Sequence, residues 1–216
     1  MSASHRPGTG PAAARRVLNV GGNSKRIPIP AHYEGWEHHL LDIDPAGAPD
    51  IVCDARAMAT LPPGSYDAVY CSHNLEHYFR HDLPKVLAGF LHVLKPAGFV
   101  DVRVPDMKAV FEEMLRRNMD IDDVLYESPA GPITINDVIY GYGRKIAESG
   151  QDFYAHKNGF THRSLAMALR TAGFPVVFLR SQPLAFDIGA IAFKQEPDPE
   201  QRALLGLPPP ARPSPG

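Results

Sequence analysis

The sequence of 216 residues has little of what marks several protein classes. Only two cysteines are present, Cys53 and Cys71, so a disulfide framework is excluded and a reducing compartment, the cytoplasm, is expected. The net charge of −2 gives no general attraction for nucleic acid. No apolar run reaches the ~18 residues of a membrane helix, and no signal-peptide stretch opens the chain. We therefore expect neither a membrane nor a nucleic-acid partner.

The composition that remains suits one globular domain, with 44% hydrophobic and 21% charged residues. Residues 1–14 are expected to be a flexible leader, because they lack an apolar pattern. Residues 15–195 are expected to form the folded domain. Residues 196–216 are dense in proline and are predicted to be a disordered tail.

Short apolar segments rich in β-formers, with turn residues at their ends, predict the first strands of a sheet. They are Arg16–Val20, His39–Ile43, Ile51–Cys53, Tyr66–Cys71 and Gly98–Val104. Between the last two, Leu83–Leu94 repeats apolar residues with the period of a helix. Strands joined by helical crossovers imply a parallel sheet with helices on its faces.

The end of the domain predicts a different connection. A helix at Ser164–Ala172 precedes strands at Val176–Leu179 and Ala185–Phe193, and only Arg180–Leu184 joins these two strands. That gap is too short for a parallel crossover, so an antiparallel hairpin is expected. The predicted fold class is α/β, a three-layer Rossmann-like sheet of seven strands, mostly parallel, with an antiparallel C-terminal hairpin.

Residues 105–163 interrupt this alternation. Asp106–Asn118 is predicted to be helical, and the rest is rich in glycine, proline and aromatic residues and reads as loops. A segment of this length before the last helix is interpreted as an inserted lid that binds substrate.

In an open parallel sheet, ligands bind beyond the carboxyl ends of the strands. Glycines and an asparagine that tolerates positive φ follow the first strand, and acids follow the second and third. The residues at these ends, with those after the fourth strand, are Gly21, Gly22, Asn23, Asp42, Asp54, Ser72 and His73. Together they offer groups suited to an adenosine that carries a polar tail.

The segments "VLNVGGN", "HHLLDIDP", "DIVCDARAMATLPPGSYDAVYCSHNLEHY" and "VLAGFLHVLKPAGFVDVRVPD" resemble class I S-adenosylmethionine-dependent methyltransferases of the type-11-like group, over about residues 16–106. The resemblance implies S-adenosylmethionine as cofactor. It places Asn19, Gly21 and Gly22 beside the methionine part. It places Asp42 at the ribose, Asp54 and the backbone of Ala55 near the adenine, and Ser72 and His73 on the cofactor floor.

The loop after the first strand departs from that pattern. Asn23 and Lys25 stand where later glycines are usual, and Pro28 and Pro30 leave little room for a full helix. The same features argue against a dinucleotide cofactor, because binding of its pyrophosphate requires a helix N-terminus that follows a loop with three glycines. A non-catalytic module that retains the cofactor fold is therefore one alternative.

The stretch His73-Asn74-Leu75-Glu76-His77 matches H-x-x-E-H, which suggests a zinc hydrolase as the other alternative. Such a site needs both histidines on one helical face. Here His73 follows a strand directly, so we expect no metal, with Glu76 at the start of the next helix.

Catalytic residues are sought in the inserted segment. His156, in "QDFYAHKNGF", is the candidate general base or acceptor ligand, with a loop-stabilising role as the other interpretation. Tyr142, Arg144 and Tyr154 are candidates for binding the acceptor. That acceptor is expected to be a small molecule or a glycan, methylated on a hydroxyl; its identity and the oligomeric state are not indicated by the sequence.

Overall fold

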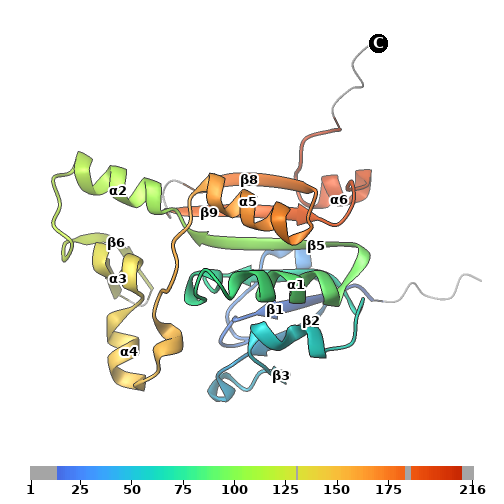
Figure 1. The fold of residues 1–216 in the computed structure, drawn as a ribbon, viewed down its shortest axis with the longest axis horizontal. Helices are drawn as coiled ribbons and strands as arrows, with labels where there is room; N and C mark the ends of the chain where they lie inside the picture. The colour runs from blue at the N-terminus through green and yellow to red at the C-terminus, as the bar shows by residue number, and fades with distance from the viewer. Residues whose placement is uncertain (1–13, 130, 183–185, 211–216) are drawn as a thin grey trace, which may run out of the picture.

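The computed structural model describes residues 14–129, 131–182 and 186–210. At its centre is a seven-stranded sheet in the order β3-β2-β1-β4-β5-β9-β8 (Figure 1). The strands are β1 (Arg16–Val20), β2 (Glu37–Asp42), β3 (Ile51–Val52), β4 (Tyr66–Ser72), β5 (Leu94–Pro105), β8 (Val176–Gln182) and β9 (Asp187–Phe193).

The pairing confirms the predicted fold class. Strands β1 to β5 run parallel to one another, whereas β9 is antiparallel to both of its neighbours. One boundary differs clearly, because β5 begins at Leu94 rather than at Gly98. The pairing of β4 with β5 shifts register between Tyr66 and Ala68, and this irregularity accommodates Pro96 at the start of the strand.

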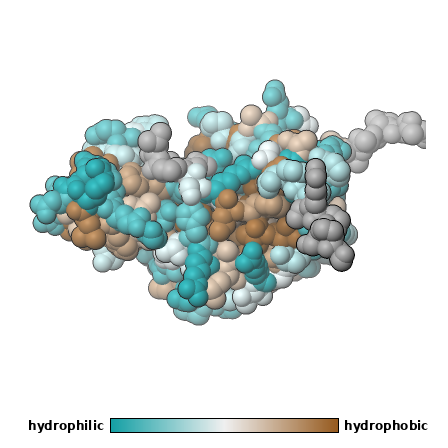
Figure 2. Space-filling view, turned by 90° about the horizontal axis from the view of Figure 1, so that it is seen from above, coloured by the Kyte–Doolittle hydropathy of each residue, from teal (hydrophilic) through white to brown (hydrophobic). Residues whose placement is uncertain are grey.

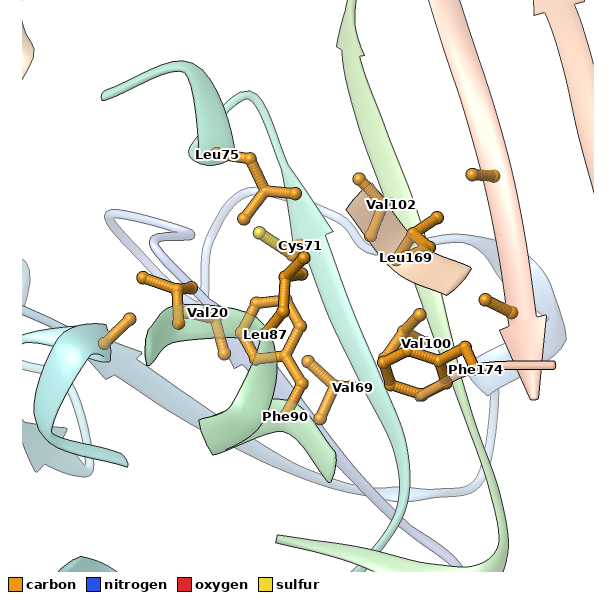
Figure 3. Packing of buried hydrophobic residues seen from close by; sticks show 14 of the residues in the cluster. Val20, Val69, Cys71, Leu75, Leu87, Phe90, Val100, Val102, Leu169 and Phe174 are labelled. Carbon is orange, nitrogen blue, oxygen red and sulfur yellow. The ribbon is translucent and has the colours of Figure 1, made fainter. Parts of the chain in front are cut away.

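One face of the sheet is covered by α1 (Leu83–Val93), α5 (His162–Ala172) and the 3-10 helix η3 (Ala55–Thr60). Figure 3 shows side chains of α1 and α5 packed against the middle of β4 and β5. Helix α5 begins where Thr161 and Ser164 form a capping box, and it ends at Gly173 with a φ of 112°. Helix α5 therefore starts and stops where its sequence provides the signals.

The other face has a thinner cover, formed by the 3-10 helix η1 (Ala31–Tyr33) and by α6 (Pro199–Leu204). The buried ring of Tyr33 stacks on Phe99, and Leu205 is 3% exposed. The disordered tail predicted from residue 196 is thus wrong for its described part, 196–210. Leu204, Leu205 and Leu207, in and after α6, pack on the face of the sheet that η1 covers only in part. The leader and residues 211–216 lie outside the described residues, apart from Ala14.

The inserted segment is more ordered than the predicted loops. It contains α2 (Met107–Arg116), a hairpin of β6 (Val124–Ser128) and β7 (Gly131–Thr134), α3 (Ile135–Tyr140), α4 (Gly143–Ser149) and the 3-10 helix η5 (Asp152–Tyr154). Helices α2 and α3 and the hairpin share a small core around Val110, Leu125 and Ile135. They project from one end of the sheet (Figure 1), where Figure 2 shows apolar side chains among polar ones.

Two 3-10 turns complete the chain, η2 (Pro45–Gly47) and η4 (Leu75–His77). Within the part of the chain that the structure describes, no helix combines the length and the apolar character that crossing a bilayer requires.

The packing of α6 can be tested with two leucines. Leu205→Ala removes a side chain that is 3% exposed, and the cavity it leaves should lower the free energy of unfolding by ~2–4 kcal/mol. Leu115→Ala is the matched control, because Leu115 is 80% exposed and its loss should cost less than ~0.5 kcal/mol. Urea denaturation of both variants gives the two values. Equal stabilities would show that α6 does not pack on the sheet.

Candidate active site

A cleft of about 590 Å³ lies at the carboxyl ends of the parallel strands. Five of the predicted cofactor residues line it, from the ends of four strands: Gly21, Asn23, Asp42, Asp54 and His73. Tyr142 and Tyr154 of the insertion line it as well. The other predicted cofactor residues, Asn19, Gly22, Ala55 and Ser72, are not among the lining residues. The structure thus brings acids and a glycine bend to one rim.

The loop after β1 needs its first glycine. Gly21 has a φ of 73° and donates its N–H to the carbonyl of Leu41 at 2.8 Å. A Cβ at this position would lie 2.1 Å from the side chain of Asn74. Gly22 is equally constrained, because a Cβ there would meet the buried amide of Asn19 at 2.2 Å. Asn19 and Gly22 therefore shape the bend from behind.

Asp42 is held in place by backbone amides. Its Oδ2 accepts the N–H of Asn23 at 2.8 Å and its Oδ1 accepts that of Asp44 at 2.9 Å, and the residue is 8% exposed. A carboxylate offers about four acceptor positions, so each oxygen keeps capacity for a ligand hydroxyl. The end of β2 thus presents a fixed, negatively charged hydrogen-bond acceptor to the cleft.

Asp54 serves a local role at the same rim. It caps η3 by accepting the N–H of Arg56 at 2.9 Å, and it pairs with the guanidinium of Arg56 at 2.6 Å. Burial raises the pKa of Asp54, but the hydrogen bonds from Arg56 outweigh it and hold the pKa below its ordinary value. Ala55 is buried in the core behind it. Arg56 itself lines the cleft and was missed by the sequence analysis.

The insertion is tied to the end of β2. The hydroxyl of Tyr154 donates to Asp44 Oδ2 at 2.7 Å. Burial and, to a smaller extent, this hydrogen bond raise the pKa of Tyr154 to about 12. Lys145 lies with its ammonium 5.0 Å from the centre of the Tyr154 ring. The insertion therefore forms one wall of the cleft. Lys145 was not anticipated, because nothing in its local sequence distinguishes it from a surface lysine.

A second, smaller cavity of about 130 Å³ lies beside the cleft. His73 and Tyr142 line both. His156 lines the smaller cavity, and its Nδ1 lies 2.8 Å from the carbonyl oxygen of Val138. Arg144 lines neither, because its side chain is 72% exposed and bonds to Glu148. Of the acceptor-binding candidates, two thus face a cavity and Arg144 does not.

The H-x-x-E-H stretch adopts an unexpected conformation. His73 has a φ of 50°, and Glu76 lies in the 3-10 turn η4 instead of opening a full helix. Burial lowers the pKa of His73, but Asp187 at 3.3 Å and Glu76 at 3.6 Å outweigh it and raise the pKa to about 10. His77 turns toward His156 instead, with ring centres 4.8 Å apart. The two histidines of the motif therefore have different partners.

Comparisons with known proteins define the class. Residues 5–179 match the model of a methyltransferase-domain family. No curated protein matches the chain. A S-adenosylmethionine-dependent methyltransferase from Archaeoglobus fulgidus has a similar structure, with a TM-score of 0.52 and 17% identity over 84% of this chain and 87% of that one. One from Methanosarcina mazei has a TM-score of 0.53 and 13% identity, over 84% and 92% of the two chains.

These matches agree with the strand order and with the cleft. The chain belongs to the class I S-adenosylmethionine-dependent methyltransferases. S-adenosylmethionine is the cofactor of this enzyme class, and the cleft fits it. Its volume is in the range of small-molecule sites, and the Asp42 carboxylate offers it a hydrogen-bond acceptor for a hydroxyl group.

Asp42→Asn tests the position of the ribose. Replacing the carboxylate with an amide removes a charged acceptor, so affinity for S-adenosylhomocysteine should fall by ~10–100-fold. The control is Asp67→Asn, at the opposite end of the sheet, where the carboxylate pairs with Lys95. Isothermal titration measures both affinities. Equal binding by the two variants would place the nucleoside elsewhere.

Proposed function

We propose that this methyltransferase transfers a methyl group from S-adenosylmethionine to a hydroxyl oxygen of a small molecule or a glycan. The observation that supports this most is the pair of neighbouring cavities that share His73 and Tyr142. The larger one has the acids and the glycine bend for the nucleoside. The smaller one is enclosed by residues of the insertion and has room for the reacting end of an acceptor.

The proposed cofactor roles are those that the family resemblance implies, and the larger cleft supports them because it gathers most of these residues. Asp42 accepts from the ribose, Asp54 lies toward the adenine, and Gly21 and Asn23 border the methionine part. Asn19 and Gly22 hold the bend in shape, and Ala55 supports η3 from the core. His73 lies at the wall between the cavities. Ser72 ends β4 next to His73 and has no direct contact with the cofactor in this proposal.

The acceptor roles follow from the smaller cavity. When bound, the cofactor supplies an electrophilic methyl group on a sulfonium. The protein then needs to align the acceptor oxygen and assist the loss of its proton. The Nδ1 of His156 faces a carbonyl, which leaves Nε2 as the nitrogen available to the acceptor side. Tyr142, which lines both cavities, positions the acceptor, and Tyr154 approaches it from the cofactor cleft. Arg144 is left out because its side chain points into solvent.

Neither alternative drawn from the sequence gains support. In the described structure His73 pairs with Asp187, so a hydrolase built on His73, Glu76 and His77 lacks its arrangement of ligands. The altered loop after β1 still forms a tight bend, which removes the main reason to propose a non-catalytic module. We also propose a reducing compartment, the cytoplasm, on the ground that Cys53 and Cys71 are both free thiols.

The function is tested with the purified protein in two stages. Isothermal titration should show binding of S-adenosylmethionine and S-adenosylhomocysteine. Incubation with S-adenosylmethionine and a panel of phenols, alcohols and oligosaccharides should then yield S-adenosylhomocysteine and a methylated acceptor, identified by mass spectrometry. A folded sample that binds neither cofactor form at millimolar concentration would refute the proposal.

The acceptor cavity has a separate test. Ile133 lines only the smaller cavity, so Ile133→Trp should fill it and raise the KM for the acceptor by about tenfold or more, equivalent to ~1.4 kcal/mol. Binding of S-adenosylhomocysteine should not change. Val124→Trp, at an exposed position of the neighbouring strand, is the control and should leave both values as they are. An unchanged KM in Ile133→Trp would place the acceptor outside this cavity.

A further inference from the structure

The carboxylate of Glu76 is buried, and the His73 ring that faces it at 3.6 Å lies beyond hydrogen-bond distance. The residue is 1% exposed, and neither carboxylate oxygen has a hydrogen bond within the described structure. Its carbonyl oxygen is fixed from the insertion by the N–H groups of Lys157 at 2.7 Å and Asn158 at 3.0 Å. A buried charge in this condition is costly unless a cation or a hydrogen-bond donor meets it.

The two histidines beside Glu76 offer lone pairs rather than protons. The Nδ1 of His77 lies 3.1 Å from the carbonyl oxygen of Ala155, and the Nδ1 of His156 lies 2.8 Å from that of Val138. A carbonyl only accepts, so in the neutral form of each ring these contacts place the proton on Nδ1, and Nε2 is the atom that can accept.

These three side chains converge. One ligand atom each from Glu76, His77 and His156 lie within 4.8 Å of one another. The nearest cationic group is the ring of His73, whose Nδ1 is 3.6 Å from Glu76 Oε1, beyond hydrogen-bond range, and whose other nitrogen faces Asp187. One carboxylate and two imidazoles thus bring a ligand atom each into the same small volume.

We propose that Glu76, His77 and His156 form a binding site for a divalent transition-metal ion. Two imidazoles and one carboxylate suit zinc, cobalt, manganese or iron, whereas magnesium and calcium prefer all-oxygen sites. Hydrogen bonds from Nδ1 of each ring to a backbone carbonyl are the outer contacts that orient metal-ligating histidines. The site joins η4 to the insertion, so the ion would also hold the insertion against the sheet.

The position of this site defines a role, which rests on the proposed methyl transfer. His77 lines the cofactor cleft and His156 lines the smaller cavity, so the ion lies where the two meet. Three protein ligands leave positions open for an acceptor oxygen. The ion lowers the pKa of the bound hydroxyl, which releases its proton to solvent. The oxygen then forms a bond to the methyl carbon as the carbon–sulfur bond breaks, and the electron pair of that bond stays on sulfur.

The test measures metal binding directly. Protein freed of metal by a chelator and then dialysed is titrated with Co²⁺, followed by visible absorption, and with Zn²⁺ in competition. One Co²⁺ per chain, with the spectrum of a nitrogen-containing site, is expected. Glu76→Gln and His156→Ala should weaken binding by more than ~100-fold, because loss of an outer contact alone commonly costs ~10–100-fold. His162→Ala is the control, since His162 also lies beside a carboxylate, Asp106, and should bind normally.

Two results would overturn the site. The first is a folded wild-type protein that takes up neither Co²⁺ nor Zn²⁺ stoichiometrically. The second is unaltered Co²⁺ binding in Glu76→Gln together with a lower Tm, which would assign Glu76 to a structural ion pair with His73. Titration of the same samples with S-adenosylhomocysteine keeps the conclusions separate. Cofactor binding without metal binding refutes only the metal site, and loss of both refutes the proposed function as well.

Discussion

The cleft depends on one buried hydrogen-bonded carboxylate. Asp42 joins the loop after β1 to the turn after β2, because its two oxygens accept the N–H groups of Asn23 and Asp44. Two loops from neighbouring parallel strands are thereby held around a single negative charge. Tyr154 of the insertion extends the arrangement through its hydrogen bond to Asp44. The loops at the rim of the cleft and the insertion that forms its wall are thus connected through a few polar contacts at the end of β2.

The insertion contributes side chains to both cavities. Part of it packs around a separate small core. The segment that leads back to the sheet donates the N–H groups of Lys157 and Asn158 to the carbonyl of Glu76, and it places His156 beside His77. The cofactor cleft and the smaller cavity share a wall as a result. Side chains that are about eighty residues apart in sequence, which local motifs do not connect, are thereby brought together.

Much of the fold was predictable because its signals are local. The apolar runs of β1 and β4, the periodicity of α1 and the short link before β9 correctly predicted a parallel sheet that ends in an antiparallel hairpin. Helix α6 was missed because a few leucines among many prolines are typical of a disordered tail. They become buried only because a face of the sheet lies beside them, which the local sequence does not indicate. The predicted roles at Asp42 and Asp54 stay predictions, although both residues do line one cleft.

The sequence by itself determined the fold class, a mostly parallel α/β sheet. It also determined that acids and glycines gather at one rim, because the carboxyl ends of parallel strands meet at one edge of the sheet. Only the tertiary structure decided which nitrogen each histidine presents, since that depends on the carbonyls of Ala155 and Val138 brought in by the insertion. It also decided that Glu76 is buried instead of facing solvent at a helix start. Burial and hydrogen-bond direction are properties of long-range packing, and a short motif contains neither.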